Sequence, residues 1–195
     1  MKDQKKLQSR QLENKRKIID ATVSLIKKEG VDSITVRRVC DVAGIATGTF
    51  YYYFKNKDEL LLSFIMESSF EDFELCTPLS DPAHRILELY TILVDKYLSF
   101  GREFMQSFYT PANTALASYM SEIDGAFLPG TVMARCESEI RLAQEAGFCD
   151  ASINAHEASE DICAIVKGAI FEYSLNCTAY DIHAALARMI TRYLA

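Results

Sequence analysis

Apolar residues recur every three or four positions along most of this 195-residue chain. That spacing places them together on one face of an α-helix. No stretch shows the sustained alternation of apolar and polar residues that is typical of a half-buried strand. Only four prolines interrupt the pattern, and we see no internal repeat or low-complexity segment. The pattern therefore predicts an all-α fold.

The predicted helices begin with a pair near the N-terminus. The first runs from about Gln11 to Glu29, and Gly30 supplies the left-handed residue that ends it. Thr35 is placed to cap a second, short helix over 36–42. The spacing of these elements indicates a small, compact unit at the front of the chain.

The remaining helices are longer and more apolar. Asn56 can cap a helix that begins at Lys57, and its apolar positions extend through Phe70. In the helix over 36–42, we expect Val39 and Val42 to face inward. Further helices are predicted at 82–100, 102–109, 112–124, 130–146, 152–176 and 179–194.

Three consecutive tyrosines stand in the stretch G48-T-F-Y-Y-Y-F-K-N-K57, just after a glycine-containing turn. Two short helices joined by such a turn match a helix-turn-helix. Each helical residue turns the side chain by about 100°, so three adjacent tyrosines cannot share one buried face. Phe50 and Phe54, four residues apart, can anchor the helix in a core. We therefore expect the tyrosines to point outward, where a ring can pack on sugar and a hydroxyl can reach a phosphate.

Charge divides the chain in two. Residues 1–60 contain 13 Lys and Arg against 8 Asp and Glu, a net charge of +5, whereas residues 61–195 contain 8 against 19, a net charge of −11. A basic front on an acidic rear favours contact of the front alone with a polyanion. Chance variation along the chain is the alternative.

The sequence offers little for catalysis or metal binding. The six cysteines form no C-x-x-C pair, and the three histidines lie far apart along the chain. Neither G-x-S-x-G nor H-E-x-x-H occurs. We therefore expect no enzyme activity, no metal and no cofactor, and we interpret the cysteines as small buried apolar residues.

No apolar run approaches the roughly 20 residues of a membrane span. The charged segment MKDQKKLQSRQLENKRK lacks the apolar core of a secretory signal. We expect a cytoplasmic protein without membrane contact.

The stretch from Ile18 to Leu60 resembles the DNA-binding domain of the tetracycline-repressor (TetR) family. The matching elements are the first-helix stripe that ends in Gly30, the Thr35 cap, A43-G-I, the G48-T-F-Y core and F54-K-N-K. The resemblance implies an N-terminal three-helix DNA-binding domain over 1–57 and a larger helical ligand-binding and dimerisation domain over 58–195. Beyond the front third, the chain matches only as a helical body of suitable length.

The resemblance also implies roles for individual residues. Those expected to meet DNA are Thr35, Val36, Arg37, Thr47, Gly48, Thr49, Tyr51, Tyr52, Tyr53 and Lys57. Ala46 stands where the family commonly has a serine cap, so we expect Thr47 to cap the recognition helix instead. Tyr53 replaces a frequent histidine and Cys40 a frequent alanine. The basic arm is open to two interpretations, phosphate contact or a solvated tail; it comprises Lys2, Lys5, Lys6, Arg10, Lys15, Arg16 and Lys17.

In the rear part, the last two helices carry small and apolar residues suited to pairing with a second copy. The predicted homodimer interface comprises Ala164, Ile165, Gly168, Ala169, Phe171, Leu175, Ile182, Leu186, Met189, Ile190 and Tyr193. Ordinary core packing within one chain is the alternative. Dimeric readers bind two half-sites about 34 Å apart, so the expected operator is an imperfect palindrome.

An aromatic-rich middle segment is our candidate for a small-molecule site, since tyrosine and methionine suit an adaptable cavity. Its residues are Tyr90, Tyr97, Phe100, Phe104, Met105, Phe108, Tyr109, Tyr119, Met120 and Phe127. The resemblance implies an inducer, which we expect to be apolar or aromatic, and a repressor that it releases from operator DNA. An activator of the same architecture and an interaction module with a non-functional helix-turn-helix are the alternatives.

Overall fold

The computed structural model describes residues 2–30, 33–65, 69–110, 112–175 and 180–194. Its helices in chain order are α1 (Lys2–Glu29), α2 (Val36–Ala43), α3 (Thr47–Tyr53), α4 (Lys57–Ile65), the 3₁₀ turn η2 (Phe70–Asp72), α5 (Pro82–Ser99), α6 (Arg102–Phe108), α7 (Thr114–Tyr119), α8 (Val132–Glu145), α9 (Ala155–Leu175) and α10 (Ile182–Tyr193). A two-residue hairpin, β1 (Glu122–Ile123) and β2 (Ala126–Phe127), follows α7. The fold is all-α apart from this hairpin, as predicted.

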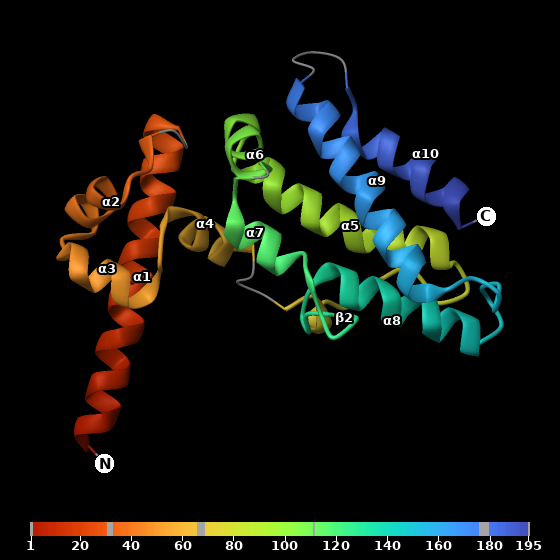
Figure 1. Ribbon diagram of the computed structural model, residues 1–195, viewed down its shortest axis with the longest axis horizontal. Helices are drawn as coiled ribbons and strands as arrows, with labels where there is room; N and C mark the ends of the chain where they lie inside the picture. The colour runs from red at the N-terminus through yellow and green to blue at the C-terminus, as the bar shows by residue number, and fades with distance from the viewer. Residues whose placement is uncertain (1, 31–32, 66–68, 111, 176–179, 195) are drawn as a thin grey trace.

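The helices form two groups with α4 between them (Figure 1). We call α1 to α3 the head and α5 to α10, with the hairpin, the body. In the head, α2 and α3 pack on the C-terminal half of α1 around buried Ile18, Val39 and Phe50. In the body, α5 packs against α8 and α10, and α9 lies against both α8 and α10. Helix α4 directly follows the head in the chain and packs against α7 and α5, so it joins the head to the body.

The caps of the head helices explain where these helices begin. The Thr35 hydroxyl accepts a hydrogen bond from the Arg38 N–H at 3.2 Å, which confirms the predicted cap of α2. The Asn56 carboxamide oxygen accepts one from the Glu59 N–H at 2.8 Å, and Glu59 reaches back to the N–H of Lys55. Both caps satisfy backbone donors that have no partner inside the helix.

The helix predicted over 112–124 is wrong in its second half. Helix α7 ends at Tyr119, and the chain reverses through Asp124 and Gly125, whose φ angles are 54° and 75°. Two consecutive positive φ angles match the type I′ turn, which the Asp-Gly pair favours because glycine adopts them without strain. The register pairs Glu122 with Phe127.

Three further predictions need correction. Phe70 does not extend α4 but lies in η2, which the Ser69 side chain caps. Val42 is 50% exposed, because the buried face of α2 is centred between Val39 and Cys40, and Val42 lies outside it. Cys76 is exposed and Cys149 is half-buried, whereas both were expected to be buried, and Cys177 lies outside the described residues.

A buried carboxylate connects α8 to α5 and to the segment that precedes α5. Glu139 is 2% exposed, and its oxygens accept from Arg85 Nε at 2.6 Å and from Arg135 Nε at 2.7 Å. Arg85 also donates to the carbonyls of Leu75 and Thr77. Arg135 donates to the carbonyls of residues 71 and 73. The two guanidinium groups thereby fix the non-helical segment that leads from η2 to α5.

No helix in the described part of the chain is both long and apolar enough to cross a membrane.

We predict that Glu139→Gln lowers the free energy of unfolding by about 3–5 kcal/mol, because it leaves two partly buried guanidinium groups without their counter-charge. Chemical denaturation monitored by circular dichroism measures this change. Glu145→Gln, an exposed position on the same helix, is the matched control and should change stability by less than about 0.5 kcal/mol. Equal small effects of both substitutions would contradict the role assigned to Glu139.

Candidate nucleic-acid interface and ligand pocket

The turn between α2 and α3 has the geometry of a helix-turn-helix. Gly44 adopts a left-handed conformation, φ 65° and ψ 38°, and its N–H donates to the Cys40 carbonyl. The N–H of Ile45 donates to the same carbonyl at 3.1 Å. These bonds end α2 and turn the chain into α3 without an intervening loop.

Helix α3 separates its aromatic residues by face. Phe50 and Phe54 are buried, with ring centroids 5.7 Å apart, whereas Tyr51 and Tyr52 are 55% and 69% exposed. Tyr53 is half-buried and packs on the core. The side chains of the outer face follow helical spacing, since Tyr51 is four residues after the exposed Thr47.

Gly48 lies on this outer face, and its place there has no explanation within the protein. A Cβ built on Gly48 meets no atom within 4 Å, and the φ angle is not in the left-handed region. Glycine lowers helix stability relative to alanine. A glycine that internal packing does not require is typical of a site where another molecule approaches the backbone.

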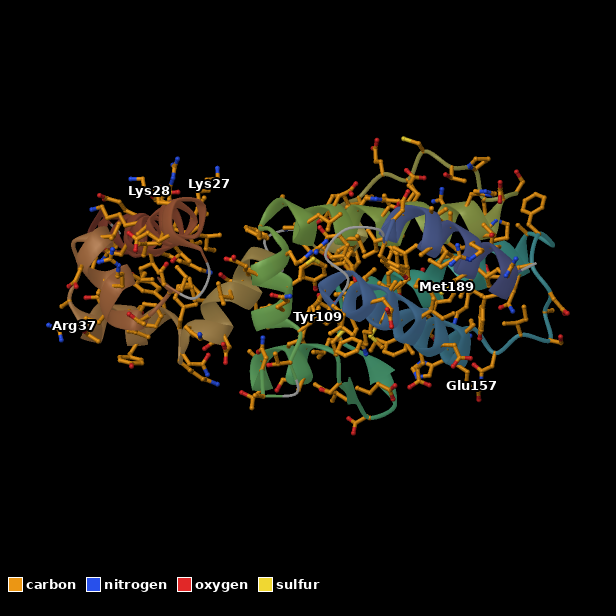
Figure 2. All side chains as sticks on the ribbon, turned by 90° about the horizontal axis from the view of Figure 1, so that it is seen from above. Lys27, Lys28, Arg37, Tyr109, Glu157 and Met189 are labelled. Carbon is orange, nitrogen blue, oxygen red and sulfur yellow. The ribbon has the colours of Figure 1, made fainter. Side chains whose placement is uncertain are left out.

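The basic residues of the head differ in what they contact. Arg38 is held by Glu29, with Nη2 2.6 Å from Oε1 and Nε 3.2 Å from Oε2, and this pairing raises the pKa of the guanidinium group. Arg37 points away from the head (Figure 2), and no carboxylate of the described residues forms an ion pair with it. Lys55, which our sequence prediction omitted, is also exposed beside α3.

The other DNA-contact candidates sit around this face. Thr35 is exposed and occupied as a cap, Val36 and Thr49 are half-buried, and Lys57 opens α4. Thr47 does not cap α3, because the N-cap position is Ala46 without a side-chain bond. The Thr47 hydroxyl instead interacts with the Cys40 thiol, whose pKa is raised mainly by burial. The side chains of the arm up to Gln11 lie outside the described part, although its backbone from Lys2 continues α1.

A cavity of about 680 Å³ lies in the body between α6, α7 and α9. Its lining is mostly apolar, and Lys167 supplies the one charged group among the described lining residues. These residues are Met105, Gln106, Tyr109, Thr110, Asn113, Leu116, Ala117, Met120, Lys167, Phe171, Ser174 and Leu175. A volume of this size accommodates a small organic molecule.

Polar bonds hold the walls of this pocket in place. Gln106 donates from Nε2 to the Ser174 carbonyl at 2.7 Å, which joins α6 to α9. The Tyr109 hydroxyl donates to the Tyr97 hydroxyl at 3.2 Å. Burial raises the pKa of both phenols, so both stay protonated at neutral pH and can serve as donors. Asn113, which caps α7, donates to the carbonyl of Phe108 at the end of α6.

The structure brings only part of the predicted ligand set to the pocket. Met105, Tyr109 and Met120 line it. Tyr97 reaches it only through Tyr109, and Phe127 stacks on His156 at the hairpin. The others belong to the aromatic core or its edge: Tyr90, Phe100, Phe104, Phe108 and Tyr119. Lys167, which sequence reasoning missed, could have been found as a single lysine within the apolar run I162-C-A-I-V-K-G-A-I-F.

The predicted dimer residues also divide. Phe171 and Leu175 are each 60% exposed, and Ala164 and Gly168 share their face of α9. Ile165, Met189 and Tyr193 are half-buried. By contrast, four residues lie in the core of the protomer, because α9 and α10 pack on each other and α10 packs on α5: Ala169, Ile182, Leu186 and Ile190. These four do not form a surface that a second copy could contact.

The head is the part of the chain that matches known proteins in sequence. The family model described as bacterial regulatory proteins of the tetR family matches residues 18–64, the span from α1 into α4. The head of this chain is therefore similar to the DNA-binding part of TetR-family regulators. The fatty acid metabolism regulator protein of Bacillus subtilis is 44% identical over 50 residues, which are 26% of this chain and 26% of that protein. The transcriptional repressor KstR of Mycobacterium tuberculosis is 42% identical over 53 residues, 27% of this chain and 24% of that repressor. The chain thus spans about a quarter of the length of these curated relatives.

Solved structures extend the likeness to the whole fold. The Thermus thermophilus TetR-family repressor FadR, crystallised with lauroyl-CoA, has a TM-score of 0.61 at 12% identity, with 92% of each chain covered. At this identity the likeness concerns the fold alone. The body shares its fold with this structure but little of its sequence, so the pocket must be interpreted from the residues of this chain.

We predict that Gly48→Ala leaves the head folded, with a stability equal to or up to about 1 kcal/mol above that of the original chain. The added methyl group meets open space in the protein but blocks close approach of DNA, so affinity for duplex DNA should fall at least about tenfold, or about 1.4 kcal/mol. Thermal denaturation and fluorescence anisotropy with labelled duplex measure the two effects. Unchanged affinity in a stable variant would remove α3 from the interface.

Proposed function

We propose that this protein is a dimeric repressor that binds an imperfect palindrome through α3 and leaves it when an apolar ligand with an acidic group fills the body pocket. Residues 1–57 serve as the DNA-binding domain and residues 58–195 as the ligand-binding and dimerisation domain. The observation that carries the proposal is the outer face of α3, where exposed Tyr51 and Tyr52 lie one turn after a glycine that packing does not require.

Dimerisation through α9 and α10 is supported by the exposed apolar surface of α9. Ala164, Gly168, Phe171 and Leu175 follow the i, i+4, i+7, i+11 spacing of one helix face. A monomer gains nothing from two large apolar side chains in water on one face, whereas a second copy would bury them. Two heads in one dimer can read two half-sites on the same side of a duplex.

The chemistry of the pocket supports the ligand class. Apolar side chains cover most of its wall, and the Lys167 ammonium can neutralise a carboxylate or another acidic group at one end. Burial raises the pKa of the Cys163 thiol, and the nearby positive charge of Lys167 partly offsets that rise. One curated relative is named a fatty acid metabolism regulator, and one structure of similar fold contains lauroyl-CoA. Both are consistent with an apolar ligand that carries an acidic group.

Two short helices connect the pocket to the head. Leu116, Ala117 and Met120 of α7 line the pocket, while Ala115 and Ser118 on its other face line a cleft of about 320 Å³ that α4 borders. Helix α6 lines the pocket too, and its Glu103 carboxylate lies close to Gly30 at the end of α1. A ligand that moves α6 or α7 therefore moves the head.

The release of DNA follows from this connection. Ligand binding favours an arrangement in which α4 tilts and the two α3 helices no longer match the spacing of successive major grooves. A difference of a few kcal/mol in ligand affinity between the two arrangements empties the operator.

The decisive experiment is selection of bound duplexes from a random library, followed by a reporter assay with the selected sequence. We expect an enriched imperfect palindrome and a lower reporter signal when the protein is present. Enrichment with a higher reporter signal would indicate an activator. Absence of any enrichment would leave a helical interaction module whose helix-turn-helix does not read DNA.

We predict that Lys167→Met weakens dodecanoate binding at least about tenfold and changes dodecanol binding less than about threefold, because only the acid pairs with the ammonium group. The affinities of the original chain and of the variant for dodecanoate and for dodecanol are measured by displacement of the fluorescent anion 1-anilinonaphthalene-8-sulfonate. Lys96→Met, on α5 and outside the pocket lining, is the matched control. An equal loss for acid and alcohol would reject the ion pair and leave only an apolar pocket.

A further inference from the structure

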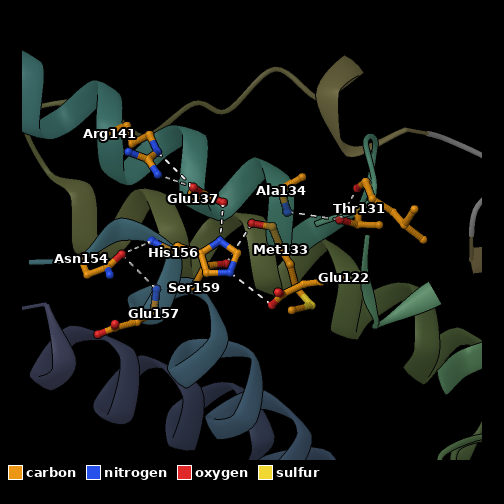
Figure 3. Close-up of polar contacts among 11 residues, drawn as sticks. Glu122, Thr131, Met133, Ala134, Glu137, Arg141, Asn154, His156, Glu157 and Ser159 are labelled. Carbon is orange, nitrogen blue, oxygen red and sulfur yellow. Dashed lines mark hydrogen bonds and ion pairs between the residues drawn. The ribbon is translucent and has the colours of Figure 1, made fainter. Parts of the chain in front are cut away.

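A histidine at the start of α9 stands between carboxylates from two other elements. His156 Nδ1 lies 3.0 Å from Glu137 Oε2 on α8, and His156 Nε2 lies 3.2 Å from Glu122 Oε1 on β1 (Figure 3). Glu160, one turn further along α9, brings another carboxylate oxygen close to this pair. One ligand atom each from Glu122, His156 and Glu160 lie within 4.8 Å of one another.

The imidazole ring is held in a fixed orientation. Phe127 of β2 stacks on it with a centroid distance of 4.2 Å and an angle of 14° between the planes. Behind the ring, Glu137 is fixed by Arg141, whose Nη2 and Nε lie 2.5 Å and 3.1 Å from Oε1. Asn154 caps the helix and accepts from the His156 N–H. The ring therefore cannot turn without the loss of several contacts.

This orientation decides the roles of the two ring nitrogens. When Nδ1–H donates to Glu137, the lone pair of Nε2 faces Glu122, and a Glu160 carboxylate oxygen lies close to both side chains. A lone pair and two anionic oxygens repel one another unless a cation lies between them. A carboxylate behind a histidine and open donor atoms in front of it are the arrangement that metal sites use to orient the ligand ring.

We propose that Glu122, His156 and Glu160 bind one divalent first-row transition metal ion, with Glu137 as the residue that positions the ring. One imidazole nitrogen with two carboxylate oxygens suits zinc and its neighbours in the series, whereas magnesium and calcium prefer oxygen ligands throughout. Ligand atoms about 2.0–2.2 Å from one ion lie roughly 3.4 Å apart in a tetrahedron, so only small side-chain rotations are needed. Water completes the coordination.

The bound ion would join the hairpin to α9. The hairpin directly follows α7, the helix that lines the pocket and packs against α4. The metal site thus fixes the C-terminal end of α7, at a place separate from the pocket. It does not depend on the proposed function, because binding of the ion requires neither DNA nor the apolar ligand.

A proton is the competing occupant of this space. An imidazolium ring would donate to both Glu122 and Glu137, and these two carboxylates raise the pKa of His156. Arg141, bonded to Glu137, and Glu160, beside Glu122, are the other charged groups at this ring. The experiment must therefore separate metal uptake from protonation.

The test is titration of the full chain, first freed of metal with a chelator, with Co²⁺ and Zn²⁺ at neutral pH. We expect one ion per chain and a Co²⁺ visible spectrum without the thiolate charge-transfer band that cysteine ligands produce. His156→Gln should abolish this binding, and Glu160→Gln should weaken it at least tenfold. Glu137→Gln should weaken it about 10- to 100-fold, as loss of an orienting carboxylate does.

Glu157→Gln is the matched control, since it removes an exposed carboxylate from the same turn of α9 but not from the cluster, and it should bind like the original chain. Circular dichroism confirms folding, and Glu160 is exposed, so its variant remains informative if His156→Gln does not fold. Uptake that survives both substitutions, a thiolate band, or equal affinity for Mg²⁺ overturns the proposal. Stabilisation by acid without metal uptake assigns the cluster to a protonated histidine instead.

Discussion

The buried carboxylate of Glu139 fixes the framework on which the other parts of the body depend. It neutralises Arg85 of α5 and Arg135 of α8, and the same two guanidinium groups bind carbonyls of the non-helical segment between η2 and α5. That segment contains no helix or strand that could satisfy its own backbone, so arginine donors take the place of a ladder. A buried charge is tolerated here because both partners are present and each is bonded several times.

This constraint makes the two sides of the body unequal. On the side of α5 and α8, ion pairs and backbone bonds hold the helices together over residues far apart in the chain. On the side of α6 and α7, the helices are short, and the pocket leaves them fewer neighbours. Because α4 packs on α7, the side of the body with the short helices is the one that supports the head. The arrangement favours transmission of a change in the pocket through α7, because α5 and α8 are held together by the ion pairs of Glu139.

The sequence predicted the head well because its signals are local. A cap at Thr35, the glycine-containing turn and the Phe50–Phe54 pair each act within a few residues, so their outcome can be inferred without tertiary structure. The prediction that Val42 faces inward was wrong, because helical spacing alone did not show how narrow the buried face of α2 is. The hairpin was missed although Asp124-Gly125 is a strong turn signal, since strands of two residues are too short for alternation to appear.

The body was harder because its candidate sites depend on which helix faces meet. Periodicity identified α9 and α10 as apolar helices. It could not show that Ile182 and Leu186 of α10 pack inward, whereas Phe171 lies on an exposed face of α9. The same limit applies to the pocket, whose aromatic neighbours are core and whose single charge comes from a helix that we had assigned to pairing alone. His156 and Glu122 are 34 residues apart, and only the fold brings them together.

The two roles of α9 have a physical consequence. Phe171 and Leu175 line the pocket and also lie on the face that we propose for dimerisation. A second copy on that face would cover the side of the pocket that these residues border and remove it from water. Apolar ligands gain most from a cavity whose walls are dry, so closure by the partner would strengthen binding. Ligand binding and pairing would then be linked, because the ligand and the second copy contact the same two side chains.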